Sequence, residues 1–177
     1  MKKILFVSEK WSGGRPEYGP SDANYIRPTL LRGSDQPLAD SEVIYYDEIG
    51  LASGRPADAE VLDCADKYQA DIVVCYPLIG YKYAIGMETW KSLRERGAKL
   101  AAAWLESTPD VVRTADEYAD VVDVNIFVDS ETIYQKHTKR PEKCLGTYHP
   151  QDSFFFKPGG DAAISVSFIG TLVSRPL

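Results

Sequence analysis

Short apolar runs recur along the chain and are separated by longer polar or mixed stretches. The first run, at residues 4–7 (ILFV), is preceded by lysines and followed by a polar loop with two glycines. A short continuous run of strand-forming residues is typical of a strand that is buried on both faces of a sheet. The same pattern predicts further strands at 42–47 (EVIYYD), 71–76 (DIVVCY), 99–105 (KLAAAWL), 124–128 (VNIFV), 144–148 (CLGTY) and 164–169 (ISVSFI).

Between these runs the apolar residues follow helical spacing. A helix over residues 21–33 would contain Pro28, so it either begins with Pro28 in its first turn or is kinked there. Thr108 before Pro109 predicts the start of another helix, or of two short turns, because a second capping box begins at Thr114. Further helices are predicted at 57–69, 83–96 and 130–137, and loops at 15–20 and 50–55.

The alternation of strands and helices predicts an α/β fold with a doubly wound, mostly parallel sheet in three layers. Right-handed crossovers place the carboxyl ends of parallel strands at one edge of the sheet, where ligands bind in such folds. We call this edge the carboxyl edge. The segments expected there are 8–15, 76–81, 106–109, 129–130 and 149–152.

Composition narrows the class of partner. The chain has 177 residues and a formal net charge of −6, and its only basic cluster is residues 137–140 (HTKR), which disfavours nucleic acid as the main partner. Three widely separated cysteines favour neither a disulfide framework nor a metal site. No apolar run approaches the length of a membrane span, so we expect a cytoplasmic protein without one.

Several common nucleotide and catalytic motifs are absent from the sequence. The loop after the first strand (SEKWSGG) has no G-x-G-x-x-G fingerprint, and neither a P-loop nor a G-x-S-x-G elbow occurs anywhere in the chain. The third predicted strand ends in CYP, without the acidic residue that a phospho-accepting receiver domain needs. The two histidines have no metal-ligand pattern around them, so we predict no metal site and no cofactor.

The polar residues at predicted strand ends are the remaining candidates for a site. Gly13 and Gly14 would let the backbone approach a ligand closely, although an ordinary flexible loop has the same composition. Glu106 follows the fourth strand and could act as a base or bind sugar hydroxyls, or it could help to cap the next helix. His149 suits proton transfer near neutral pH, or it could have a structural role.

Three more residues are candidates for substrate binding. Asn24 and Arg27 lie near the start of the first predicted helix, where an anion could bind, and a surface salt bridge is the alternative. Asp129 ends the fifth predicted strand, where it could bind substrate or cap the helix that starts at Ser130.

Three segments in the last third of the chain carry a resemblance to a known family. They are 122–130 (VDVNIFVDS), 146–158 (GTYHPQDSFFFKP) and 164–176 (ISVSFIGTLVSRP). Together they resemble the two-domain glycosyltransferases of the GT-B type, and most closely those grouped with spore-coat maturation glycosyltransferases. In these enzymes a P-x-D…F segment precedes a linker, and a V-S-F-I-G-T…R strand opens the second domain. The matching positions here are Pro150, Asp152, Phe156, 166–171 and Arg175.

The resemblance implies a Rossmann-like N-terminal domain at 1–158, followed at 159–177 by a linker and the first strand of a donor-binding domain. It implies transfer of a sugar from a nucleotide-sugar donor to a hydroxyl of a sugar or glycan acceptor, without an essential metal. This chain would be the acceptor side, inactive without its second domain, and Glu106 or His149 would polarise the acceptor. Lys10 and the bulky Trp11 precede the glycines, which disfavours a phosphate-cradling loop.

Two other interpretations stay open on the sequence alone. A stand-alone flavodoxin-like domain that binds a nucleotide or phosphate would contain a complete pocket of its own. An interaction module without a catalytic role would show the same alternation of strands and helices.

Overall fold

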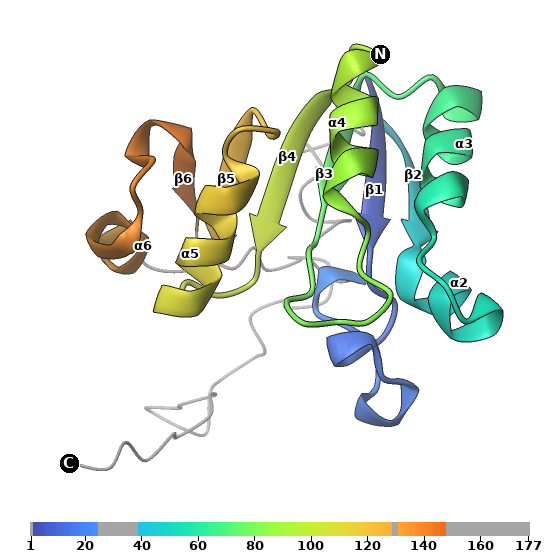
Figure 1. Cartoon of the computed structure of the whole chain (residues 1–177), viewed down its shortest axis with the longest axis horizontal. Coiled ribbons are helices and arrows are strands. Elements are labelled where there is room, and N and C mark those ends of the chain that lie inside the picture. The colour runs from blue at the N-terminus through green and yellow to red at the C-terminus, as the bar shows by residue number, and fades with distance from the viewer. Residues whose placement is uncertain (1, 25–38, 129–130, 148–177) are drawn as a thin grey trace, which may run out of the picture.

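All the strands of the sheet run in the same direction. The computed structural model describes residues 2–24, 39–128 and 131–147, and within these ranges one sheet has the strand order β2-β1-β3-β4-β5-β6, with every neighbouring pair parallel (Figure 1). The strands are β1 (Lys3–Ser8), β2 (Asp40–Tyr45), β3 (Ile72–Cys75), β4 (Lys99–Trp104), β5 (Val124–Val128) and β6 (Cys144–Thr147). The predicted α/β fold with a doubly wound parallel sheet is therefore confirmed, and its layered architecture is Rossmann-like.

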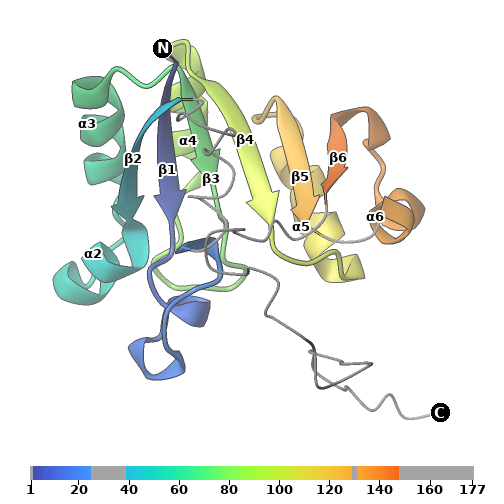
Figure 2. The same cartoon turned by 180° about the vertical axis from the view of Figure 1, so that it is seen from behind.

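Helices pack on the sheet as the alternation predicts. The described helices are α2 (Tyr46–Ser53), α3 (Asp58–Tyr68), α4 (Met87–Glu95), α5 (Pro109–Tyr118) and α6 (Glu131–His137), with short 3₁₀ turns η1 (Ser12–Gly14), η2 (Pro16–Tyr18) and η3 (Pro141–Lys143). Helices α3, α4 and α5 lie over one face of the sheet, which Figure 2 shows from the opposite side.

Both faces of the central strands are buried, which explains their continuous apolar runs. On β1, Leu5 and Val7 pack into the larger core cluster beneath α3, α4 and α5. Phe6 points to the opposite face and packs there with Ala23, which lies in a helical turn at 23–24. Alternate residues of one strand thus enter two separate cores, as expected for the middle layer of a three-layer fold.

One predicted loop is in fact a helix. Residues 50–55 were expected to be a loop after a strand at 42–47, but β2 ends at Tyr45 and α2 begins at the next residue. Gly50 suggested a loop, yet it lies inside the helix. Glycine is needed there because the side chain of Tyr83 packs against it, and a Cβ would lie 2.6 Å from Tyr83 Cβ. Gly54 ends the helix in the left-handed conformation, with a φ of 74°.

Two other expectations about helices are corrected. Residues 109–118 form one continuous helix, α5, rather than two short turns, and Thr108 occupies its N-cap without a side-chain hydrogen bond. Helix α4 begins at Met87, later than the predicted residue 83. Its start is fixed by Asp58, whose Oδ1 accepts hydrogen bonds from the Gly86 N–H at 2.8 Å and the Thr89 hydroxyl at 2.6 Å.

Several predicted features lie outside the described residues. These are most of the first helix with Pro28, the last predicted strand at 164–169, and the proposed division between 1–158 and 159–177. They stay predictions.

The strand order reverses between β1 and β3. The chain leaves β1 toward β2 on one side, whereas it leaves β3 toward β4 on the other. In open α/β sheets this switch point, at the carboxyl edge, is where ligands bind. The loop that follows β1 (residues 9–24) and the loop between β3 and α4 (residues 76–86) both begin at this switch point.

Candidate functional site

A buried carboxyl group stands directly after β1 at the switch point. Glu9 is only 5% exposed, and its Oε1 accepts a hydrogen bond from the hydroxyl of Ser21, which is also buried. Its second oxygen, Oε2, is buried and makes no hydrogen bond. Native proteins leave few buried polar atoms unpaired, so such an atom at a ligand-binding edge is a candidate functional group.

The surroundings of Glu9 disfavour its ionised form. Burial raises the pKa of the Glu9 carboxyl, and the negative charge of Asp47 raises it further. The Ser21 hydrogen bond and the nearby peptide N–H groups of Gly14 and Gly13 act in the opposite direction, because each favours the carboxylate. Desolvation is the largest of these effects, so Glu9 holds its proton to a higher pH than an exposed glutamate does.

A second buried carboxylate fixes the shape of the loop after β1. Asp47, in the first turn of α2, is fully buried. Its two oxygens accept hydrogen bonds from the backbone N–H groups of Lys10 at 2.8 Å and Trp11 at 2.9 Å, and one of them also accepts from the N–H of Glu48. The helix N-terminus favours a negative charge at this position. Asp47 thereby ties the loop to α2 and holds Glu9 in place.

The two glycines of the loop have different surroundings. Gly13 and Gly14 have φ angles of 61° and 67°, which most other residues avoid. Gly13 is exposed, whereas Gly14 is buried beneath the ring of Tyr81, so that a Cβ on Gly14 would lie 2.5 Å from Tyr81 Cε2. The backbone of Gly14 thus lies close to the Tyr81 side chain of the neighbouring loop. A role for Gly13 and Gly14 in binding a ligand stays a prediction.

Asn24 lies in the helical turn at 23–24, as predicted, and it also contacts the loop after β1. Its amide nitrogen donates hydrogen bonds to the carbonyl oxygens of Lys10 at 2.9 Å and Ser21 at 3.1 Å, which closes the loop on itself. Its Oδ1 is buried and unpaired. Asn24 therefore holds the loop closed and leaves a further hydrogen-bond acceptor beside it.

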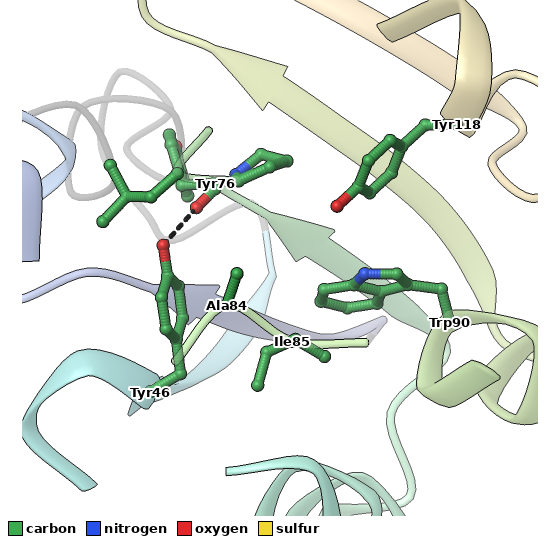
Figure 3. Close-up of a pocket in the computed structure, with 8 residues that line it drawn as sticks. Tyr46, Tyr76, Ala84, Ile85, Trp90 and Tyr118 are labelled. Atoms are coloured by element: carbon green, nitrogen blue, oxygen red, sulfur yellow. Dashed lines mark hydrogen bonds between the residues drawn. The ribbon is translucent and has the colours of Figure 1, made fainter. Parts of the chain in front are cut away.

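Aromatic side chains fill the space behind the switch point. The hydroxyl of Tyr46 donates to the backbone carbonyl of Tyr76 at 2.9 Å, and both residues line a small cavity together with Trp90 and Tyr118 (Figure 3). The cavity volume is about 10 Å³, the space for the centre of about one water molecule. Because a sugar ring is far larger, this cavity is part of the core and not the substrate site.

Glu106 lies at the same edge, in the segment between β4 and α5, and is exposed. Strands β1 and β4 are both neighbours of β3, so their ends are two strand spacings apart, about 10 Å. The edge thus brings together a buried carboxyl group, Glu9, and an exposed one, Glu106. The other predicted site residues, Arg27, Asp129 and His149, lie outside the described residues.

Glu9, Ser21, Asp47 and Tyr81 are the residues that the sequence analysis missed at this edge. For Glu9 a signal was present, because it follows an apolar strand directly, as Glu106 nearly does. For Asp47 the signal was hidden by assigning residues 42–47 to a strand. Tyr81 follows β3 in a run of tyrosines, and nothing local distinguishes it from its neighbours.

The described ranges contain neither a metal-binding cluster nor a helix that could span a membrane. Within them no group of three or more His, Cys, Asp or Glu side chains is placed to hold a metal ion. Among the helices of the same ranges, none combines the length and apolar character needed to cross a bilayer. No protein-family model matches the chain, and none of the curated proteins compared with it is significantly similar in sequence.

Proposed function

We propose that this chain is the N-terminal, acceptor-side domain of a glycosyltransferase of the GT-B type, acting with a second domain that binds a nucleotide-sugar donor. The observation that carries the proposal is the meeting of Glu9, the Gly13–Gly14 loop and Glu106 at the carboxyl edge of a parallel sheet. The resemblance of the segments at 122–130, 146–158 and 164–176 to this enzyme class supports it independently of the fold.

The proposed reaction needs a proton acceptor at this edge. The acceptor oxygen forms a bond to the anomeric carbon of the donor sugar, and the bond from that carbon to the nucleotide phosphate breaks, with its electron pair leaving on the phosphate. The acceptor O–H must lose its proton to a base. We assign the role of this base to Glu106, which is exposed at the carboxyl edge. His149, outside the described residues, is the alternative.

The loop after β1 suits an uncharged ligand better than a phosphate. Phosphate-cradling loops present free backbone N–H groups. Here the N–H of Gly14 donates to the Trp11 carbonyl at 2.8 Å, that of Ser12 to Gly19 at 2.9 Å, and that of Arg15 to Ser12 at 3.2 Å. The nearby carboxyl groups would also repel an anion. These contacts favour a sugar hydroxyl at this loop.

A second candidate function is supported by the strand order. The order β2-β1-β3-β4-β5 is that of flavodoxin-like domains, which bind their phosphorylated ligand at the β1/β3 switch point. This interpretation makes the chain a stand-alone nucleotide- or phosphate-binding regulatory domain. It predicts binding of phosphate by the loop after β1.

An NMR titration of the ¹⁵N-labelled chain separates the two functions. We expect methyl glucopyranosides to shift amide signals of residues 9–24 and 105–108 in a saturable way, and inorganic phosphate and UDP to leave them unchanged. Glu106→Gln should weaken the glycoside effect, whereas Glu117→Gln, which alters an exposed side chain in the last turn of α5, should not. Saturable binding of phosphate or UDP at residues 9–14 would instead support the flavodoxin-like function.

The natural reading frame provides a second test. A frame of about twice this length that encodes a second α/β domain with a pair of acidic residues would support the glycosyltransferase proposal.

A further inference from the structure

Unpaired buried polar atoms gather around the Gly13–Gly14 loop. They are Oε2 of Glu9, Oδ1 of Asn24 and the hydroxyl oxygen of Tyr81. A buried polar atom without a hydrogen bond lowers the stability of the folded state. A cluster of such atoms therefore indicates groups that could form hydrogen bonds to a ligand. Glu9 and Asn24 come from the loop after β1, whereas Tyr81 comes from the loop between β3 and α4.

Glu9 and Tyr81 lie on either side of Gly14. The ring of Tyr81 packs directly on the Gly14 α-carbon, and the peptide N–H groups of Gly14 and Gly13 approach the Glu9 carboxylate. Burial raises the pKa of the Tyr81 phenol most, followed by the interactions with Asp47 and Tyr83, and the charge of Glu9 raises it least. Gly14 thus has the Tyr81 ring against its α-carbon and the Glu9 carboxyl group near its peptide N–H.

We infer that Glu9 Oε2 and the Tyr81 hydroxyl together form a binding site for one uncharged alcohol group of a ligand. The inference rests on the proposed acceptor-side function and assigns the acceptor a specific anchor. An alcohol O–H suits the pair because its oxygen accepts a hydrogen bond from the phenol while its hydrogen is donated to the carboxylate. Tyr81 is thereby a residue that determines specificity, contributed by a different loop from the one that carries Glu9.

The chemistry of the pair excludes anions. A phosphate or carboxylate ligand would be repelled by Glu9 and by the nearby charge of Asp47. Access depends on Tyr81, since its ring covers Gly14 through van der Waals contact. Displacement of the ring from Gly14 opens the site, and the entering hydroxyl replaces the missing hydrogen-bond partners of both residues.

The test uses the full 177-residue chain with glutamate ¹³C-labelled at the side-chain carboxyl carbon. The probes are glycerol and methyl α-glucopyranoside, with inorganic phosphate and ethylamine as charged comparisons. We expect both alcohols to shift the Glu9 resonance in a saturable way. Tyr81→Phe keeps the ring on Gly14 and removes only the hydroxyl, so it should weaken this binding about tenfold.

Two further variants complete the design. Glu9→Gln should weaken binding of the same probes by at least about tenfold, followed on tyrosine ring signals, provided its thermal unfolding confirms a folded chain. Tyr18→Phe removes a hydroxyl from the same loop, at a side chain in η2 that is 62% exposed, and should leave the affinity unchanged.

The outcomes separate this inference from the proposed function. Absence of a saturable Glu9 shift with either alcohol, equal affinity in Tyr81→Phe, or tighter binding of phosphate or ethylamine would each overturn the inference. If glucoside still perturbs residues 105–108 in that case, the acceptor-side function survives without this anchor. If alcohols bind at Glu9 as expected but the chain with its donor domain transfers no sugar, the site stands and the proposed function fails.

Discussion

The α-carbon of Gly14 lies so close beneath the ring of Tyr81 that a methyl group there would sit 2.5 Å from Tyr81 Cε2. This contact joins the two loops that flank the reversal of strand order. It also explains why glycine is required at this position, in addition to its φ of 67°.

Gly14→Ala should destabilise the chain by more than the neighbouring change Gly13→Ala. Both substitutions force alanine into a positive φ, which is unfavourable by about 1–2 kcal/mol. Only Gly14→Ala also displaces the Tyr81 ring, which adds about 1–3 kcal/mol of overpacking, since the nearest atom to a Cβ on Gly13 is 4.0 Å away. Urea unfolding of both variants measures the difference.

A double-mutant cycle tests the cause of that difference. In a Tyr81→Ala background the extra effect of Gly14→Ala should disappear, because the ring is gone. Equal effects of the two glycine substitutions in the unaltered chain would contradict the contact.

In the Asp47→Asn variant the loop after β1 should unfold more readily than in the unaltered chain. The aspartate oxygens accept from the N–H groups of Lys10 and Trp11, and asparagine replaces one oxygen with a donor that faces an N–H group. We expect a loss of about 2–3 kcal/mol in the free energy of unfolding, and faster hydrogen exchange at these two amides. Glu48→Gln removes only the ion pair with Lys10 at the surface and should change stability by less than about 0.5 kcal/mol.

Glu9→Gln should change how stability depends on pH. In the folded chain the pKa of Glu9 is raised above its ordinary value of 4.5 by burial, with Asp47 adding to the effect. The contribution of Glu9 to the free energy of unfolding is complete below the pKa that Glu9 has in the unfolded chain. It is lost as pH rises through the pKa that Glu9 has in the folded chain. Relative to wild type, Glu9→Gln should therefore gain stability from about pH 4 to pH 7, by about 1.4 kcal/mol for each unit by which the pKa is raised.

Denaturant unfolding of both proteins across this pH range gives the measurement. Taking the difference cancels the titration of the exposed carboxylates, which is common to the two proteins. The groups that face Glu9 are Asp47, Tyr46 and Tyr81, and none of them is altered. A difference in stability that stays constant with pH would show that Glu9 is not desolvated.

The three cysteines should differ in reactivity. Cys75, on the central strand β3, is 2% exposed, and burial raises the pKa of its thiol to about 12. Cys64 and Cys144 are half-buried, and burial raises their pKa values less strongly. At pH 8 a thiol reagent should label these two in the native chain and Cys75 only after unfolding.

Cys75→Ser is the control for this labelling. It should leave the native labelling unchanged and lower the total found in denaturant by one thiol. Native labelling of Cys75 at the rate of the other thiols would mean that β3 is not a buried strand.

The parallel sheet could be predicted because its signal is strong and local. β1 is apolar from Ile4 to Val7 and β5 at every position except Asn125, since both of their faces are covered, and such runs are hard to mistake. Helix α2 was missed because Tyr46 and Asp47 continue the pattern of the preceding strand, and because Gly50 and Gly54 suggest a loop. Gly50 is explained only by the ring of Tyr83, which lies far away in sequence.

The candidate site was harder to predict than the sheet for a related reason. Glu106 and the glycines follow strands, and topology alone brings them to one edge. The environment of Glu9 includes the hydroxyl of Ser21 and the charge of Asp47, two residues that approach it only after the loop and α2 have folded. Sequence position can place a carboxyl group at an edge, but it does not state whether water reaches it.

The direct passage from β2 into α2 has a consequence for how this chain can vary in length. One residue inserted between Tyr45 and Tyr46 would turn the helix by about 100° about its axis. Asp47 would then move away from the peptide groups of Lys10 and Trp11, and the loop after β1 would lose these two hydrogen bonds to α2. Insertions and deletions in relatives should therefore avoid this junction and accumulate beyond the far end of the helix, around Gly54 and Arg55.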